Sequence, residues 1–227
     1  MPRRISLENP IMKNKSFLIA LSLAALVSAG CDWRGIRGNG AVKTEQRPVT
    51  GFARVDAGGF YELEWQPGAP SCSVTTDENL LSHIETRVEG EVLKIEMHGS
   101  IAPSHKIQIA ISSTSLAGAS LSGALRFKAM PLTGSTFALD TSGASKVTLA
   151  GKVNRLLASL TGASKLEATD LAAEDVELSV TGAGKAEVTA SNLLRAGITG
   201  AGKVSYGGHP KSVEKKITGA GSIKPRD

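Results

Sequence analysis

Five basic residues recur along the second half of the chain at a nearly constant distance. Each stands three places after a glycine, and neighbours are 18 to 20 residues apart: Arg126, Lys146, Lys165, Lys185 and Lys203. Like charges that lie close together repel, so such a row must lie in water or face an anion. The row is therefore either a solubilising stripe that discourages sheet association, or a linear docking surface for a polyanion such as an acidic glycan, lipopolysaccharide or nucleic acid.

The glycines that precede these cations mark a repeat, which begins at about residue 116: Gly123, Gly143, Gly162, Gly182, Gly200 and Gly219. A hydroxyl residue precedes each glycine, an alanine follows it, and an apolar residue stands four places after it. Self-similarity at this period is typical of a solenoid. Units this small cannot bury their apolar side chains alone, but stacked units can, because equivalent strands pair about 4.8 Å apart. The glycine and alanine columns fit a tight corner where larger side chains would crowd the next coil.

We therefore predict an all-β fold, a parallel β-helix or β-solenoid with coils of about 19–20 residues. From Val49 up to the repeat, apolar and polar residues alternate, which predicts strands that cap or continue the solenoid. The stretch DENLLSHI at 77–84 predicts one helical turn between strands. The alternative is an antiparallel sandwich with similar hairpins, and the recurring alanine column argues against it.

The first thirty residues are predicted to be a lipoprotein signal peptide, with either Met1 or Met12 as its start. A short basic segment precedes an apolar run, 17–30, that is shorter than the roughly 20 residues of a bilayer span. The run ends in Ala29-Gly30-Cys31, which resembles the bacterial lipobox, so Cys31 is the predicted lipidation site. An ordinary signal that happens to precede a cysteine is the alternative.

The mature chain is predicted to divide into a tether and one domain. Residues 31–47 are polar and rich in glycine and charge, which is typical of a flexible tether; the alternative is that 38–47 already form the first strand. Residues 48–227 form the β-solenoid domain. The second cysteine, Cys72, then has no partner and is expected to be a buried small apolar residue.

Several motifs could carry other chemistry, but each is incomplete. Gly197–Lys203 has the spacing of a phosphate loop, but Val204 stands where Ser or Thr would hold Mg²⁺, and a strand pattern follows. The histidines have no metal-ligand spacing: His83, His98, His105 and His209. An acidic cluster is better explained by a solvated turn than by a glycan-active site: Asp170, Glu174, Asp175 and Glu177. We therefore predict no enzyme activity, no metal site and no cofactor.

Net charge adds little about partners. The formal charge of +5 includes four basic residues and one acidic residue in the first thirty, so the chain from Cys31 on carries +2. This balance predicts no specific nucleic-acid partner.

Three stretches carry a resemblance to a known family. They are GNGAVKTEQRPVTGFARVDAGGFYELEW, VTTDENLLSHIETRVEGEVLKIEM, and the SGA and TGAGK repeats. Over about 38–223 the chain resembles the bacterial auto-transporter adhesin, head GIN domain family. The resemblance implies a secreted or lipid-anchored β-solenoid and carries over no catalytic residues. The segment AGGFYEL departs from the more Gly- and Ser-rich turn of the family.

Together these features predict a cell-envelope lipoprotein whose β-helical ectodomain is an adhesin or ligand-binding surface module. Its expected partners are the membrane, through the lipid anchor, and an acidic glycan, lipopolysaccharide or envelope protein. Asp32 resembles an inner-membrane retention signal, so the sequence leaves open which membrane holds the anchor. The alternatives are a structural or signalling accessory of the envelope without an external ligand, and a glycan-active β-helix enzyme.

Overall fold

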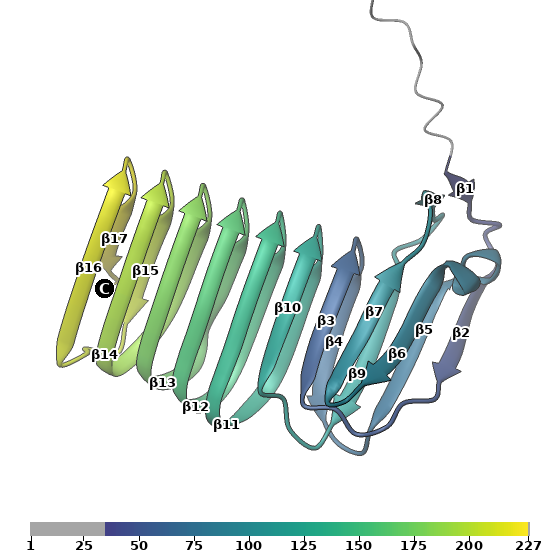
Figure 1. Ribbon diagram of the computed structural model, residues 1–227, viewed down its shortest axis with the longest axis horizontal. Helices are drawn as coiled ribbons and strands as arrows, with labels where there is room; N and C mark the ends of the chain where they lie inside the picture. The colour runs from purple at the N-terminus through teal and green to yellow at the C-terminus, as the bar shows by residue number, and fades with distance from the viewer. Residues whose placement is uncertain (1–34, 227) are drawn as a thin grey trace, which may run out of the picture. The chain divides into compact units, whose positions relative to one another are not determined.

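The computed structural model describes residues 35–226, and most of these lie in β-strands (Figure 1). The strands before the repeat are β1 (Ile36–Arg37), β2 (Val42–Arg47), β3 (Arg54–Gly59), β4 (Glu62–Pro67), β5 (Ser71–Asp77), β6 (Ile84–Glu89), β7 (Val92–Met97), β8 (Ile101–Ala102) and β9 (Gln108–Ser113). The repeat contains β10 (Gly118–Gly123), β11 (Arg126–Gly143), β12 (Lys146–Gly162), β13 (Lys165–Gly182), β14 (Lys185–Gly200), β15 (Lys203–Gly207), β16 (Ser212–Gly219) and β17 (Ser222–Pro225). The helical turn predicted at 77–84 is the 3-10 helix η1 (Glu78–His83).

The strands of the repeat stack in parallel, so the prediction of a parallel β-solenoid is confirmed (Figure 1). The sheet order is β17-β15-β14-β13-β12-β11-β10-β3-β7-β6. Gly123 pairs with Gly143, Gly143 with Gly162, and so on along the stack to Gly219. The spacing of 18 to 20 residues between the repeat glycines therefore sets the register of the sheet.

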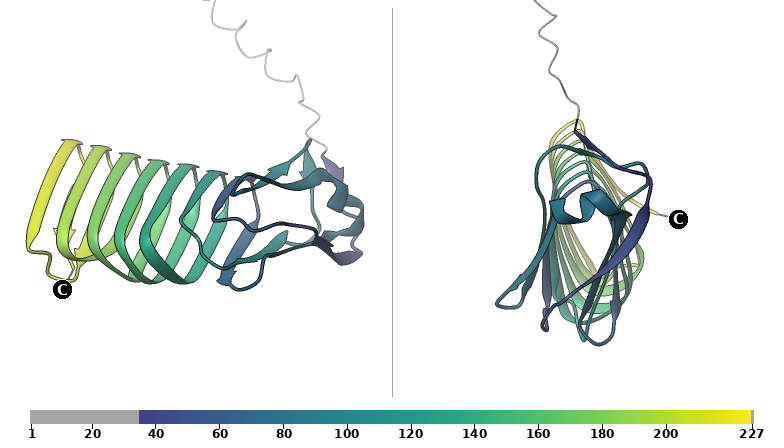
Figure 2. Two further views of the ribbon diagram at one scale, coloured as in Figure 1. Left: turned by 60° about the horizontal axis from the view of Figure 1, so that its bottom comes forward. Right: turned by 90° about the vertical axis from the view of Figure 1, so that its right-hand side faces the viewer.

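Each coil has two sides that meet at the glycine corner (Figure 2). We call the side that leaves the corner the basic side, which comprises residues 126–130, 146–150, 165–169, 185–189 and 203–207, with β4 before them and β17 after them. We call the side that returns to the next corner the hydroxyl side, which comprises residues 138–143, 157–162, 177–182, 195–200 and 214–219, with β3 and β10 before them. The exposed Ser and Thr column of the repeat lies on this second side.

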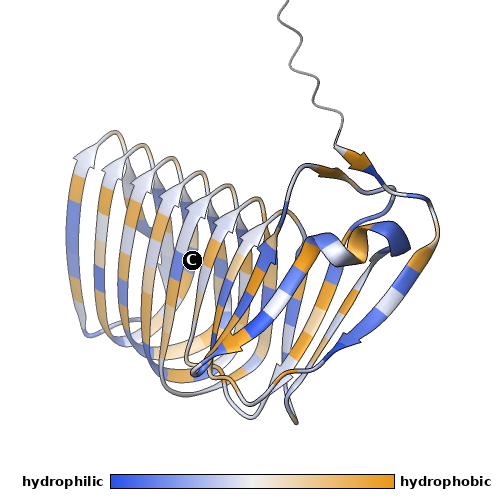
Figure 3. Cartoon of the chain, turned by 45° about the vertical axis from the view of Figure 1, so that its right-hand side comes forward, coloured by the Kyte–Doolittle hydropathy of each residue, from blue (hydrophilic) through white to orange (hydrophobic). Residues whose placement is uncertain are grey.

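Apolar and polar residues alternate along the strands (Figure 3), and the apolar ones form the buried interior. The residues four places after the repeat glycines all point inward and are at most 7% exposed: Phe127, Val147, Leu166, Ala186, Val204 and Ile223. Fully burying a side chain the size of Val, Leu or Phe contributes roughly 1.5–3 kcal/mol. Each coil therefore gains stability by covering the apolar interior of its neighbour.

One polar residue interrupts an inward column. Thr141 is 4% exposed and stands where the adjacent coils have Leu121 and Leu160. Its Oγ1 has no hydrogen-bond partner among the described residues. A buried hydroxyl without a partner costs about 1–3 kcal/mol.

We expect Thr141→Val to raise the free energy of unfolding by about 1 kcal/mol, because Val keeps the shape of Thr and removes the hydroxyl. Urea denaturation followed by circular dichroism measures the change. The control is Thr161→Val, which makes the same chemical change at an exposed position and should stay within about 0.5 kcal/mol of wild type. A destabilised Thr141→Val variant would show that the hydroxyl has a partner.

The N-terminal end of the stack is covered. β2 runs antiparallel to β5, β6 runs antiparallel to β7, and η1 lies across the end with Leu80 and Leu81 buried beneath it (Figure 2). The carboxylate of Asp77 is buried here and accepts hydrogen bonds from the backbone N–H groups of Gly40 and Ser104, both at 2.8 Å. The early strands therefore both continue and cap the solenoid, as predicted.

The structure corrects the part of the predicted tether that it describes, residues 35–47. Val42–Arg47 is strand β2, and Ile36–Arg37 is strand β1, which pairs with β8. Backbone pairing with β5 overrides the polar composition, so the alternative of a strand within 38–47 holds for 42–47, although β1 precedes it. The predicted signal peptide over 1–30 and Cys31 lie outside the described residues. Among those described, no helix is long and apolar enough to cross a bilayer.

Cys72 is buried, as expected, at 1% exposure. Burial raises the pKa of its thiol to about 11. The thiol therefore stays protonated at neutral pH, which makes it a poor nucleophile.

Candidate binding site on the basic side of the solenoid

The five cations of the repeat lie in one row. Arg126 pairs in register with Lys146, Lys146 with Lys165, Lys165 with Lys185, and Lys185 with Lys203. Adjacent coils are about 4.8 Å apart, so the charges follow one another at that spacing. We call these five residues the basic ladder. Their role in binding stays a prediction.

A row of glutamates beside the basic ladder was missed in the sequence. Glu167 accepts from Lys165 at 2.6 Å and from Lys146 at 3.0 Å, and Glu187 lies 2.6 Å from Lys185. Hydrogen bonds from Lys165 and Lys146 lower the pKa of Glu167 to about 2, so it remains ionised at neutral pH. The signal was available, because residues i and i+2 of a strand share a face.

Cations nevertheless outnumber carboxylates on this side. The outward-facing basic residues are Arg126, Lys128, Lys146, Lys165, Lys185, Lys203 and Lys224. The outward-facing acidic residues are Glu62, Glu64, Glu167 and Glu187. Lys203 forms no ion pair with another described residue. The surplus of positive charge is compatible with an anionic ligand, and the paired glutamates reduce its field.

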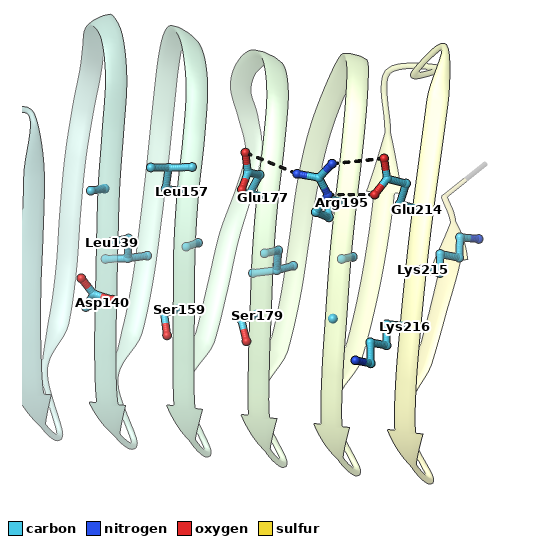
Figure 4. A pocket seen from close by; sticks show the side chains of 15 residues that line it. Leu139, Asp140, Leu157, Ser159, Glu177, Ser179, Arg195, Glu214, Lys215 and Lys216 are labelled. Atoms are coloured by element: carbon cyan, nitrogen blue, oxygen red, sulfur yellow. Dashed lines mark hydrogen bonds and ion pairs between the residues drawn. The ribbon is translucent and has the colours of Figure 1, made fainter.

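A hollow of about 760 Å³ lies on the hydroxyl side (Figure 4). Arg195 crosses its edge and pairs with Glu214 at 2.8 Å and with Glu177 at 3.9 Å. Leucines, among them Leu157, and short side chains such as Ser159 and Ser179 also line it. The hollow is a shallow trough across several coils and does not contain the basic ladder.

The acidic cluster at 170–177 does not lie in a turn, contrary to the sequence interpretation. All of it belongs to the continuous strand β13, which bends around the coil through irregular pairing between Ala168 and Asp175. Asp175 accepts a hydrogen bond from Asn192 at 2.7 Å and lies 3.8 Å from Arg155. With Glu177 beside Arg195, two of the four carboxylates have arginine partners, which is typical of structural ion pairs.

Three potential metal ligands meet on the β6–β7 hairpin: Glu85, Glu96 and His98. Arg87 already occupies this cluster, with Nη1 at 3.0 Å from Glu85 and 2.8 Å from Glu96. His98 Nε2 lies 2.7 Å from Glu85. A guanidinium between the carboxylates competes with a cation, so we interpret the cluster as an ion-pair network. The absence of a metal site remains a prediction.

The fold and this site define a class of protein: a parallel β-solenoid, capped at its N-terminal end, with a row of cations along one side. The chain belongs to the family described as "Putative auto-transporter adhesin, head GIN domain", whose model matches residues 51–210. The resemblance noted in the sequence is confirmed. No curated protein matches the chain significantly.

Solved structures share the fold. A "putative adhesin" from Bacteroides fragilis NCTC 9343 is 22% identical, with a TM-score of 0.67, over 85% of this chain and 100% of its own. A "putative adhesin" from Parabacteroides merdae ATCC 43184 is 20% identical, with a TM-score of 0.52, over 85% and 99%. A "putative lipid binding protein" from Parabacteroides distasonis ATCC 8503 is 23% identical, with a TM-score of 0.51, over 85% and 99%.

Proposed function

We propose that the protein is a cell-envelope lipoprotein, anchored through Cys31, whose solenoid is an adhesin-type module that binds an acidic glycan or lipopolysaccharide through the basic ladder. The observation that carries the proposal is the in-register stacking of the five cations. The family description and the names of the solved relatives support a surface or envelope role. A linear polyanion can meet several rungs at once, which strengthens binding without requiring a deep pocket.

The alternative is a structural accessory of the envelope without an external ligand. Lys146, Lys165 and Lys185 form ion pairs with glutamates, and this favours the alternative. A stripe that only keeps the sheet soluble does not need lysines that are available to a ligand. The two functions differ in whether the ladder binds a polyanion.

The test replaces four lysines of the ladder with glutamine: Lys146, Lys165, Lys185 and Lys203. We expect binding to immobilised alginate, heparin and lipopolysaccharide to fall at least about tenfold, and the salt dependence of binding to weaken with it. A matched control makes the same four charge changes elsewhere: Lys94, Lys152, Lys211 and Lys216. Equal binding by the ladder variant and wild type would refute the proposal.

A converse change sharpens the test. Glu167→Gln with Glu187→Gln removes the carboxylates that compete for the lysines, so binding of the same polyanions should strengthen. If the ladder is a solubilising stripe, neither change alters polyanion binding.

The anchor has its own test. Several acyl chains on Cys31 would hold the protein firmly to a membrane, because each buried CH₂ contributes about 0.8 kcal/mol. We expect Cys31→Ser to be released into the soluble fraction, and globomycin to cause the unprocessed precursor to accumulate. Mass spectrometry of wild type should find acyl groups at Cys31. An unmodified, soluble wild-type protein would contradict the lipoprotein assignment.

A further inference from the structure

The corner beside the basic ladder carries small residues in every coil of the repeat. The residue after each repeat glycine is an exposed alanine: Ala124, Ala144, Ala163, Ala183, Ala201 and Ala220. Each alanine N–H from Ala124 to Ala201 donates to the carbonyl of the corner glycine one coil earlier, at 2.8–2.9 Å. The corners therefore form a low ridge along which a ligand can approach the backbone.

One more corner belongs to this ridge, and it carries a phenylalanine. Gly59 pairs in register with Gly123, and the N–H of Ala124 donates to the Gly59 carbonyl at 2.9 Å. Phe60 therefore occupies the position that alanine has in the later coils. Its side chain is 44% exposed. Since alanine satisfies the corner elsewhere, the packing of the coil does not require an aromatic residue here.

Phe60 lines a hollow of about 420 Å³ together with Pro103, His105, Lys106, Ile107 and Arg126. This volume lies within the range of roughly 300–1,000 Å³ that is typical of small-molecule sites. A second hollow of about 170 Å³ continues toward Lys146 and shares Glu62 and Arg126 with the first. The two hollows connect the aromatic corner to the start of the basic ladder.

The polar groups around Phe60 combine donors with an acceptor. Glu62 lies 2.8 Å from Lys106 and 3.9 Å from Arg126. The hydrogen bond from Lys106, together with the two positive charges, lowers the pKa of Glu62, so its carboxylate is ionised at neutral pH. The side chains of Lys106 and Arg126 are 70% and 67% exposed and have donors left for a ligand.

We propose that Phe60 is the stacking platform of a subsite for one uronic acid residue of an acidic glycan, with Arg126 and Lys106 binding the sugar carboxylate and Glu62 accepting hydrogen bonds from ring hydroxyls. The apolar face of a sugar ring packs against an aromatic ring, and its hydroxyls require both donors and acceptors. A polyanion that is bound by charge alone would neither stack on Phe60 nor donate hydrogen bonds to Glu62. The subsite rests on the proposed function and adds to it a fixed end point for the glycan, at the capped end of the ladder.

The test is Phe60→Ala, which installs the residue of the other corners, so the fold should be retained and a thermal melt verifies this. Binding is measured by isothermal titration calorimetry with an alginate hexasaccharide and with inorganic polyphosphate, which has charge but no rings. We expect Phe60→Ala to weaken alginate binding about tenfold and to change polyphosphate binding less than twofold. Phe60→Trp should retain alginate binding. The control Val42→Ala removes another exposed apolar side chain, 51% exposed, on strand β2 outside the basic side, and should bind both probes like wild type.

Each other outcome has a definite meaning. Unchanged alginate binding by Phe60→Ala overturns the subsite and leaves the basic ladder standing. Equal weakening for both probes also overturns the subsite, because stacking cannot act on polyphosphate. A wild-type protein that binds polyphosphate but no alginate overturns the subsite alone, and one that binds none of alginate, heparin and lipopolysaccharide overturns the proposed function as well.

Discussion

Gly162→Ala is expected to lower the free energy of unfolding by about 2–5 kcal/mol. Gly162 has φ of 96°, and a Cβ built on it would lie 2.5 Å from the carbonyl oxygen of Gly143 in the adjacent coil. The left-handed conformation costs a residue with a side chain roughly 1–2 kcal/mol. The clash adds about 1–3 kcal/mol, because neither corner can move without breaking the register of the coils on both sides.

Thermal and urea denaturation followed by circular dichroism measure this loss. For a domain of this size, 1 kcal/mol corresponds to about 2–4 °C in Tm, so a fall of roughly 10 °C is expected. Gly40→Ala is the control, because Gly40 also has a positive φ, 80°, but nothing lies within 4 Å of its built Cβ. Its loss should be limited to the conformational strain. Equal losses in the two variants would show that the corners do not press on one another.

Lys215→Ile is expected to make the domain self-associate through its C-terminal end. β16 is the last strand on the hydroxyl side and pairs with β14 on one edge. Val213, Lys215 and Ile217 stand in register with the buried Leu194, Ala196 and Ile198, yet all of β16 is exposed. Figure 3 shows the strand as hydrophilic at its centre.

Lys215 thus puts a charge at a core-facing position of an edge that no described strand covers. Its Nζ lies 4.9 Å from the centroid of the Tyr206 ring and 3.4 Å from the Ile223 carbonyl oxygen. An inward-pointing charge on an edge strand discourages edge-to-edge pairing. With isoleucine the edge would present three consecutive inward apolar residues above unpaired backbone groups, which is a template for a second copy.

Sedimentation of the two variants over a concentration series measures this effect. We expect Lys215→Ile to dimerise with a Kd at least about tenfold lower than that of wild type. Lys216→Ile makes the same change one residue on, where the side chain faces outward, and should behave like wild type. A Lys215→Ile variant with the wild-type mass at every concentration would mean that the lysine does not guard this end.

The glutamates beside the basic ladder have two opposite effects, one on the stability of the ladder and one on its binding of a polyanion. The glutamates beside Lys146, Lys165 and Lys185 hold the lysine side chains in place, which lowers the repulsion within the ladder. They also compete with any polyanion. Exposed ion pairs contribute roughly 0–1 kcal/mol each, so a multivalent ligand can displace them without unfolding the coil.

Much of the architecture follows from the sequence alone, because residues in register on adjacent coils of a parallel solenoid recur in the sequence at the length of one coil. The repeat glycines are 18 to 20 residues apart, so the coils have nearly equal length, and shifts in pairing within the coils absorb the differences. Lys146 therefore lies beside Lys165. The buried apolar columns follow from the same periodicity. The strand β2 did not follow, because all its residues after Val42 are polar, on both faces, and its place depends on pairing with β5.

What the sequence determined is therefore the repeated part: an all-β solenoid, its core columns and its row of cations. The tertiary structure decided the parts that depend on contacts between different segments. Phe60 was hidden because an inserted segment, from β5 to β9, separates its corner from the regular repeat, and the pairing of Gly59 with Gly123 restores the alignment. The sequence does not distinguish Lys215 from other surface lysines. The structure shows that it stands in register with Ala196 on the last described strand of the hydroxyl side. The periodicity of the sequence shows which residues share a column. Contacts with segments outside the repeat form only in the folded chain, so the sequence pattern does not show them.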